Sequence, residues 1–268
     1  MLKDHPVVRR LTDAEVYVLT LQSDTEEAPW MVMTDFQWNV VALLMSILDQ
    51  HARRQGLGWY LSAELKVTMP LPVGVVLPPA ITVGASQTSL DAAPDLMMAV
   101  AENRERSSWK VADEGPPQFV LEVVSEESLQ RDLVQKPVIY QVMGVQEYAI
   151  YAPHRKDGGP PLLGFRRGDE GRFVAWTVDA RGILWSDTLG LGLCRVANDR
   201  LRVRDHSGVL LPSLQEEAAA TRAQAAAART EATEAETART EAEAARARET
   251  ALRQAAEAEV ARLRAMLD

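Results

Sequence analysis

Cysteine is almost absent from this chain of 268 residues: Cys194 alone is present, which excludes an intrachain disulfide framework and a cysteine-based zinc cluster. No apolar run approaches the roughly 18 residues of a membrane-spanning helix. The start, MLKDHPVVRRLTDAE, lacks the apolar core of a signal peptide. An excess of basic residues is also lacking, since the net charge is −9. That charge disfavours broad affinity for nucleic acid but leaves room for a local basic site. We therefore expect a cytoplasmic protein without a membrane partner.

Glycine and proline are missing from about residue 214 onward, where alanine, glutamate and arginine dominate. These three are strong helix formers, so residues 213–268 are predicted to form one long helix. Large apolar residues occur only near its end, at mixed spacings of three and four: Leu252, Val260, Leu263 and Leu267. Such spacing is typical of a coiled-coil seam. Two alternatives are open for this segment. It is either a single exposed helix or an alanine-rich coiled coil that joins copies of the chain through residues 215–268.

The rest of the chain reads as a lead-in, residues 1–30, and one domain, residues 31–212. Within this domain, residues 34–56 and 125–143 have helical patterns, while VGVVLPPAITVG, FVLEVV, EYAIYAP and several later segments read as strands. The mixture predicts an α/β fold of the α+β type, with flanking helices around one central mixed sheet.

Glu122 interrupts an otherwise apolar strand, FVLEVV. Alternation places Phe119, Leu121 and Val123 on one face, and Glu122 between two valines on the other. Both faces are apolar, which is typical of a central strand covered on both sides. An ionised carboxylate there is costly unless a cation or several N–H groups pair with it. The plainer alternative is a glutamate at a strand end with access to water.

Three further polar residues follow at steps of four: Asp132, Lys136 and Tyr140. On a helix they share one face, which either forms an exposed salt bridge or borders the region around Glu122. Asp95 follows a proline at the start of the apolar strand LMMAV. Two carboxylates and a lysine from neighbouring elements are able to hold Mg²⁺ and to support hydrolysis of a phosphodiester.

Several linked motifs stand in this order, and together they resemble the Uma-type restriction endonucleases, a branch of the PD-(D/E)XK nuclease superfamily. The resemblance covers about residues 30–210. The matching segments are Pro94-Asp95, Glu122-Val123-Val124-Ser125, the residues at steps of four just described, and Gly144-Val145-Gln146-Glu147-Tyr148. The resemblance implies a restriction-endonuclease-like core, a DNA substrate, and Mg²⁺ or Mn²⁺ as the cofactor.

The resemblance also implies roles for single residues. Asp95, Glu122 and the backbone carbonyl of Val123 would bind the metal ion. The usual lysine two residues after the glutamate is Val124 here, so the resemblance implies that Lys136 replaces it and stabilises charge on the reacting phosphate. Asp132 and Tyr140 would support Lys136.

Two positions depart from the pattern of the family. Gln37 stands where the family usually has a histidine on the first long helix, and glutamine cannot act as a general base. Pro137 follows Lys136 directly, so it bends a helix there or marks a later helix start.

A polar segment, residues 102–117, joins the two acid-bearing strands, and we expect its ends to lie at the proposed site. Its Arg104, Arg106 and Lys110 are either contacts for a nucleic-acid backbone or parts of a solvated hairpin. The leading hypothesis is a metal-dependent DNA endonuclease. The alternative is a degenerate nuclease-like module that binds nucleic acid or acts as a scaffold, brought into oligomers by its C-terminal helix.

Overall fold

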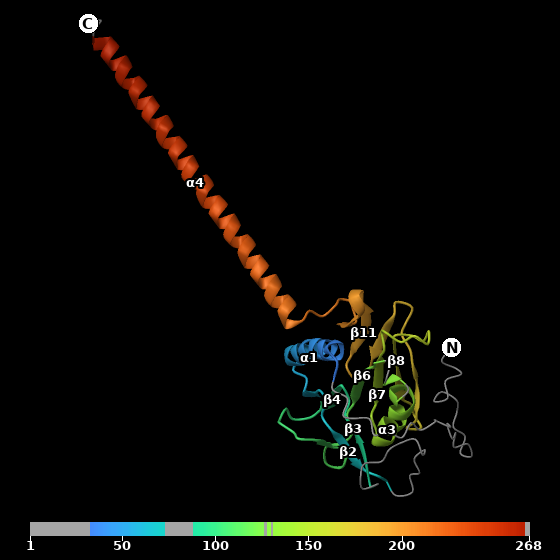
Figure 1. The fold of residues 1–268 in the computed structure, drawn as a ribbon. Coiled ribbons are helices and arrows are strands. Elements are labelled where there is room, and N and C mark those ends of the chain that lie inside the picture. Colours follow the sequence, from blue (N-terminus) through green and yellow to red (C-terminus); the bar gives the residue numbers. More distant parts are fainter. Residues whose placement is uncertain (1–32, 73–87, 126–127, 130, 266–268) are drawn as a thin grey trace. The chain divides into compact units, whose positions relative to one another are not determined.

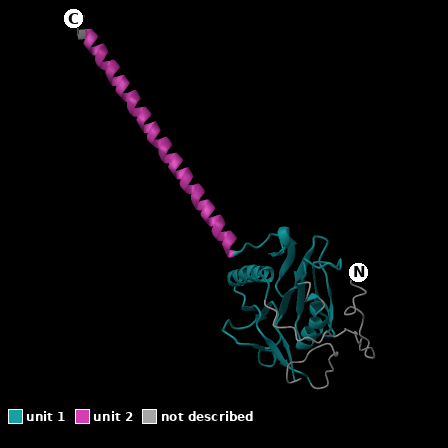
Figure 2. Ribbon diagram, in the orientation of Figure 1, with its two compact units in different colours: residues 1–213 teal, residues 214–268 magenta. Residues whose placement is uncertain are grey.

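A computed structural model describes residues 33–72, 88–125, 128–129 and 131–265. The predicted lead-in and the predicted strand VGVVLPPAITVG lie outside these residues. The chain divides into two compact units, residues 1–213 and residues 214–268, which Figure 2 shows in different colours.

The first unit is built on a mixed six-stranded sheet with the order β1-β4-β6-β7-β8-β9. Its strands are β1 (Trp59–Ser62), β4 (Leu96–Val100), β6 (Phe119–Val123), β7 (Glu147–Tyr151), β8 (Leu162–Arg167) and β9 (Phe173–Trp176). β6 and β7 run parallel, whereas the other neighbouring pairs are antiparallel. The carboxyl ends of β6 and β7 therefore lie at the same edge of the sheet as the start of β4. We call these strand ends, where Asp95, Glu122 and Val123 lie, the site edge.

Helix α1 (Asp35–Gln55) lies where the apolar pattern predicts it. Thr34 is its N-cap, and Gly56, with a φ of 66°, ends it in the left-handed conformation that glycine adopts without strain. The helix buries one apolar stripe, consisting of Val40, Val41, Leu44, Ile47 and Leu48. This stripe packs on the same face of the sheet as Phe119, Leu121 and Val123 of β6.

The mixed six-stranded sheet is the central sheet that the sequence predicts, and two three-stranded sheets that the sequence did not predict flank it. One has the order β10-β11-β12, and the other has the order β3-β2-β5. Their strands are β10 (Ile183–Ser186), β11 (Leu191–Val196), β12 (Arg200–Arg204), β3 (Ser89–Ala92), β2 (Val67–Pro70) and β5 (Trp109–Lys110). A short helix α2 (Val111–Glu114) follows β5, and a 3-10 turn η3 (Ala197–Asp199) precedes β12. The late strands pair among themselves because tight turns join them to each other.

Both faces of β6 are covered, as the sequence predicts. α1 and the sheet β10-β11-β12 cover one face. Helix α3 (Lys136–Met143) and the sheet β3-β2-β5 cover the other, where Val120 and Val124 point. Figure 1 shows α1 and α3 on opposite sides of β6 and β7. The predicted mixed α/β fold with flanking helices is confirmed.

The regular α-helix after β6 starts later than the predicted Ser125. A π-helical turn, η2 (Arg131–Gln135), leads directly into α3, which begins at Lys136. Pro137 therefore lies in the first turn of α3, where the missing N–H has no intrahelical acceptor. The wider η2 turn replaces the regular helix that Pro137 would have interrupted.

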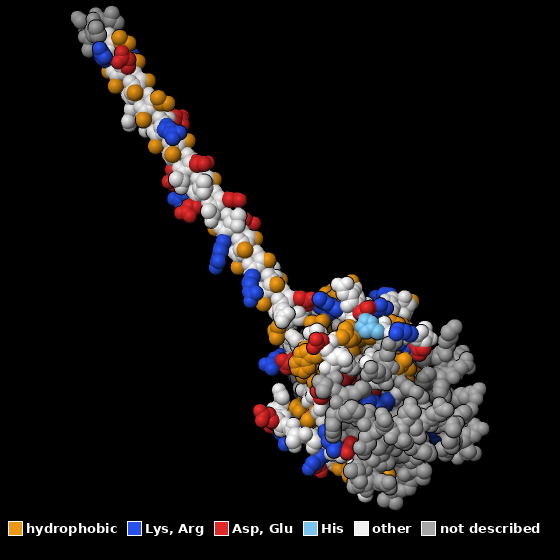
Figure 3. Space-filling view, viewed as in Figure 1, with side chains coloured by type: hydrophobic (Ala, Val, Ile, Leu, Met, Phe, Trp, Pro, Cys, Tyr) orange, Lys and Arg blue, Asp and Glu red, His pale blue; other side chains and the backbone are white. Residues whose placement is uncertain are grey.

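The second unit is one helix, α4 (Leu214–Ala265), of 52 residues. Acidic and basic side chains alternate along it with small apolar ones (Figure 3). Leu252, Val260 and Leu263 are exposed on it. Among the described residues, no helix is long and apolar enough to cross a membrane.

Candidate active site

Asp95 and Glu122 meet at the site edge because β4 and β6 are antiparallel. Leu96 lies opposite Leu121, which brings Asp95, the residue before β4, beside Glu122 near the end of β6. Asp95 Oδ2 accepts a hydrogen bond of 2.6 Å from the backbone N–H of Val123. The Glu122 side chain is buried. The carboxyl groups of Asp95 and Glu122, which are distant in the sequence, thus lie near each other at the site edge.

Lys136 joins Glu122 to Asp132. Its Nζ lies 2.8 Å from Glu122 Oε1 and 2.8 Å from Asp132 Oδ1. Tyr140, one helical turn later, donates a hydrogen bond of 2.7 Å to the same Oε1 of Glu122. The three residues at steps of four therefore face the buried glutamate rather than forming an exposed salt bridge. Pro137 does not prevent this, because Lys136 begins α3.

The site carries more negative than positive charge. Asp95, Glu122 and Asp132 face the ammonium group of Lys136, and the exposed Arg131 guanidinium lies 4.0 Å from Asp132 Oδ1. The pKa of Glu122 is raised to about 8, chiefly by burial; Lys136 opposes the rise, and the neighbouring Asp95 and Asp132 add to it. Burial likewise raises the pKa of Asp95 to about 6. Burial thus disfavours the ionised forms of Glu122 and Asp95, and an additional cation would favour them.

Glu122 has its printed side-chain contacts on one oxygen. Both Lys136 and Tyr140 contact Oε1. Carboxylate oxygens are the preferred ligands of Mg²⁺, which commonly takes one or two of them and completes its shell with water. The donor set fits such an ion. In the described ranges no three side chains of His, Cys, Asp or Glu converge as metal ligands, so the set is limited to this pair.

Gln37 approaches the site from α1. Its Nε2 donates a hydrogen bond of 2.6 Å to the backbone carbonyl of Val123, 86 residues away in the sequence. The helix position assigned from the family pattern is therefore at the site edge. The carbonyl that the resemblance implied as a metal ligand thus accepts this amide N–H with one of its two lone pairs.

The segment with Arg104, Arg106 and Lys110 lies at the opposite edge of the sheet, so the expectation that its ends reach the acids is wrong. It joins the end of β4 to the start of β6, whereas Asp95 and Glu122 lie at the other ends of these strands. Strands of this length separate the two edges by about 13 Å.

Arg106 is also committed to local contacts. Its guanidinium pairs with Glu114 at 2.7 Å and lies 4.2 Å from the ring centroid of Tyr60. Its side chain is only 4 % exposed. Arg104 pairs with the same glutamate at 3.4 Å. These contacts favour the hairpin interpretation for the two arginines.

Sequence reasoning missed three residues at or near the site. The Tyr148 hydroxyl donates 2.7 Å to the backbone carbonyl of Asp132, which fixes the turn that carries the aspartate. The ring of exposed His154, just after β7, lies 4.8 Å from that of Phe36, next to Gln37. Nothing in the sequence alone marks Phe36 or His154 as a site residue. Tyr148 is part of the motif Gly144-Val145-Gln146-Glu147-Tyr148, but the motif assigned it no role.

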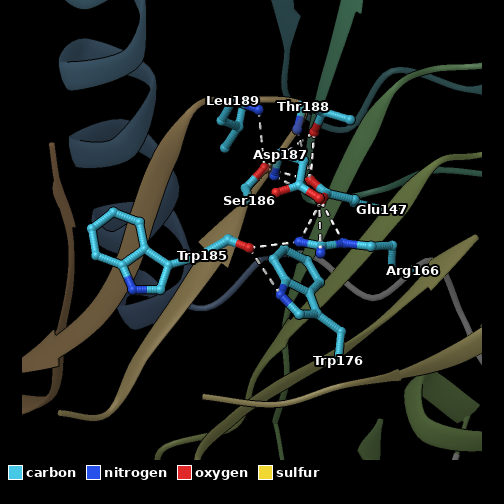
Figure 4. A network of polar contacts seen from close by, with 8 residues as sticks. All are labelled: Glu147, Arg166, Trp176, Trp185, Ser186, Asp187, Thr188 and Leu189. Atoms are coloured by element: carbon cyan, nitrogen blue, oxygen red, sulfur yellow. Dashed lines mark hydrogen bonds and ion pairs between the residues drawn. The ribbon is translucent and has the colours of Figure 1, made fainter. Parts of the chain in front are cut away.

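Glu147, the other motif residue without an assigned role, forms a second buried network (Figure 4). It accepts hydrogen bonds from Arg166 Nε at 2.9 Å, the backbone N–H of Asp187 at 2.9 Å and Thr188 Oγ1 at 2.5 Å. Ser186 Oγ and the backbone N–H of Thr188 also donate to it. The carboxylate thus ties β7 to the turn between β10 and β11.

Comparison with known proteins gives a family for the chain. The model of the Uma2 family, described as "Putative restriction endonuclease", matches residues 26–194, more than half of the chain. The chain is also similar to the crystal structure of "a putative nuclease belonging to DUF820" from Anabaena variabilis, with 10% identity and a TM-score of 0.41. That similarity covers 59% of this chain and 76% of the other, and it is too weak to support a conclusion. No curated protein matches the chain.

Proposed function

The chain belongs to the Uma2 family of restriction endonucleases, and from that premise we propose that it hydrolyses DNA phosphodiester bonds with Mg²⁺ or Mn²⁺. The observation that carries the proposal is the meeting of Asp95, Glu122 and Lys136 at the site edge. Three buried or half-buried carboxyl groups around one ammonium form a centre that lacks positive charge. A divalent cation and the phosphate it binds would complete that centre.

Each residue has a defined task in this proposal. A bound Mg²⁺ or Mn²⁺ supplies Lewis acidity toward water and phosphate oxygens. Asp95 and Glu122 hold the cation. Lys136 has three N–H donors, two of which face Glu122 and Asp132, and the third is available to orient the attacking water or to stabilise charge on the phosphate. Asp132 and Tyr140 position Lys136 and Glu122.

Cleavage of supercoiled plasmid with Mg²⁺ or Mn²⁺ tests the proposal. Glu122→Gln keeps the size of the side chain but removes its charge, and we expect at least a 10³-fold loss of the cleavage rate. Lys136→Met should lower the rate by about 10²–10³-fold, as the loss of one donor to a developing charge does. Lys66→Met, which removes an exposed lysine that pairs with Asp91, is the matched control and should cleave like the wild type. Equal rates for the wild type and Glu122→Gln would refute the proposal.

One observation favours the alternative, a degenerate module that binds nucleic acid or acts as a scaffold. The Val123 carbonyl is engaged by Gln37, and the described residues offer only two carboxylates for the cation. The same plasmid assay separates the alternatives, because such a module would bind DNA in a gel shift without cutting it at any Mn²⁺ concentration.

We also infer that α4 joins copies of the chain, with residues 1–30, 31–212 and 213–268 as lead-in, nuclease domain and oligomerisation helix. The exposed Leu252, Val260 and Leu263 support this inference, because they lie at spacings of three and four or their multiples. The single exposed helix is the alternative, and the mass of the full chain in solution decides between them. A cytoplasmic location stays a prediction.

A further inference from the structure

The side chain of Gln37 makes two kinds of contact, one through its amide oxygen and one through its amide nitrogen. As the third residue of α1, its Oε1 accepts a hydrogen bond of 2.9 Å from the backbone N–H of Thr34, and the Thr34 hydroxyl accepts 3.3 Å from the N–H of Gln37. Glutamate at this position would cap the helix equally well. Glutamate could not, however, donate the hydrogen bond of 2.6 Å that Gln37 Nε2 makes to the Val123 carbonyl. The amide of Gln37 therefore provides the contact to Val123 in addition to capping α1.

The Val123 carbonyl lies between two backbone N–H groups that are both paired. The N–H of Val123 donates 2.6 Å to Asp95 Oδ2, and the N–H of Val124 donates 2.8 Å to the carbonyl of Tyr151. Because the peptide between Val123 and Val124 is planar, the second of these bonds also fixes the direction of the carbonyl oxygen, which faces the Gln37 amide. An N–H donor at 2.6 Å uses a lone pair of that oxygen and offsets its negative partial charge. Both effects make the oxygen a poorer ligand for a cation.

We propose that Gln37 is a positioning residue that withholds the Val123 carbonyl from the cation, so that the site offers two carboxylates, Asp95 and Glu122. The inference rests on the proposed function, because it concerns the same cation. Such a site binds a divalent cation weakly by itself, and its remaining coordination positions go to water and to the phosphate of the substrate. Gln37 thereby links cation binding to the presence of substrate.

Two substitutions separate the contributions of the amide. Gln37→Glu keeps the helix cap, removes the donor and adds a carboxylate beside the freed carbonyl. Gln37→Met removes the donor without adding charge. The affinity for Mn²⁺ of the full chain, measured by titration calorimetry without nucleic acid, should rise about tenfold or more in Gln37→Glu, because ligand charge sets the affinity of such sites. In Gln37→Met it should rise severalfold.

Two matched controls show whether added charge near the site, or a weakened helix cap, is enough to change the affinity. Asn39→Glu adds the same charge in the same part of α1 at an exposed position, and it should leave the Mn²⁺ affinity within twofold of the wild type. Thr34→Ala weakens the cap but leaves the contact between Gln37 and Val123, and it should also bind Mn²⁺ like the wild type. Circular dichroism verifies that every variant is folded.

The outcomes distinguish this inference from the function it rests on. If Glu122→Gln loses Mn²⁺ binding while both Gln37 variants bind like the wild type, the role of Gln37 is refuted and the cation site stands. Tighter binding in Gln37→Glu together with weaker binding in Gln37→Met would also refute it, because charge alone would then be acting. If the wild type and Glu122→Gln bind Mn²⁺ with equal measurable affinity, the proposed function itself fails.

Discussion

Glu122 and Glu147 are two buried glutamates on neighbouring parallel strands, each 1% exposed, yet their surroundings differ. Glu147 accepts hydrogen bonds from one arginine, two hydroxyl groups and two backbone N–H groups. Glu122 shares a single lysine with Asp132 and has one tyrosine hydroxyl. A carboxylate that is surrounded by donors has no room for a ligand, whereas one with fewer donors can accept a cation.

The difference indicates two roles for the same residue type. Glu147 stabilises the fold, because its donors come from β8, from the end of β10 and from the turn after β10, which it ties together. Glu122 is held in a place that disfavours its charge, and burial raises its pKa to about 8. Perturbed groups of this kind concentrate at functional sites. The comparison predicts opposite effects on stability when each charge is removed.

Glu147→Gln should have the larger effect on stability. The substituted amide would direct an N–H₂ group at hydroxyl and backbone donors, and Arg166 would lose its buried partner. We expect the free energy of unfolding to fall by about 3–4 kcal/mol, as when one partner of a buried ion pair is removed. Urea unfolding followed by tryptophan fluorescence measures it, since Trp176 and Trp185 lie in this network.

Glu122→Gln is the matched control at pH 8, where it should leave the free energy of unfolding unchanged or raise it. A loss of several kcal/mol in Glu122→Gln, or an unchanged stability in Glu147→Gln, would contradict the comparison.

The pH dependence of stability sharpens the same contrast. Glu122 has a pKa of about 8 in the folded chain against 4.5 as its ordinary value, and Asp95 has about 6 against 3.8. The folded state therefore binds more protons than the unfolded state between about pH 4 and 8. Stability is then highest in the acid part of this window and is lost as the pH rises through the folded pKa values. From pH 5 to 8 these shifts correspond to a loss of about 5 kcal/mol, about 3–4 from Glu122 and about 1–2 from Asp95, at roughly 1.4 kcal/mol for each pKa unit.

Comparing the wild type with Glu122→Gln isolates this contribution. His51 acts in the opposite direction, because burial lowers its pKa, but it is present in both proteins and cancels in the difference. Urea unfolding at pH 5, 6, 7 and 8 should show a gap between the two proteins that changes steadily with pH. A constant gap would mean that Glu122 titrates normally.

The parts of the molecule that sequence predicted are those with a local pattern. The apolar alternation of FVLEVV placed β6 and its two covered faces, and the stripe on α1 placed that helix. Asp132, Lys136 and Tyr140 share one face, as their spacing of four predicts, because the turn η2 leads directly into α3.

What sequence could not predict depends on distant partners. The direction of β4 against β6 decides at which edge residues 102–117 lie, and no local pattern encodes it. The contact between Gln37 and Val123 spans 86 residues, and the hydroxyl partners of Glu147 lie about 40 residues away. In each case the side chain looked ordinary in the sequence because its partner comes from another element of the fold.

Tyr140 and Tyr148 give the smallest and most selective test of the comparison. Both hydroxyls are buried and donate at 2.7 Å, but Tyr140 donates to the Glu122 carboxylate and Tyr148 to a backbone carbonyl. Tyr140→Phe should therefore cost about 1.5 kcal/mol at pH 8.5, where Glu122 is ionised, and clearly less at pH 5. Tyr148→Phe should cost about 1 kcal/mol at both pH values, because its acceptor does not titrate.

Burial raises the pKa of both phenols, so both remain donors across this range. Urea unfolding of the two variants at the two pH values measures the costs. An equal pH dependence in both would show that the ionisation of Glu122 does not govern the strength of its hydrogen bond.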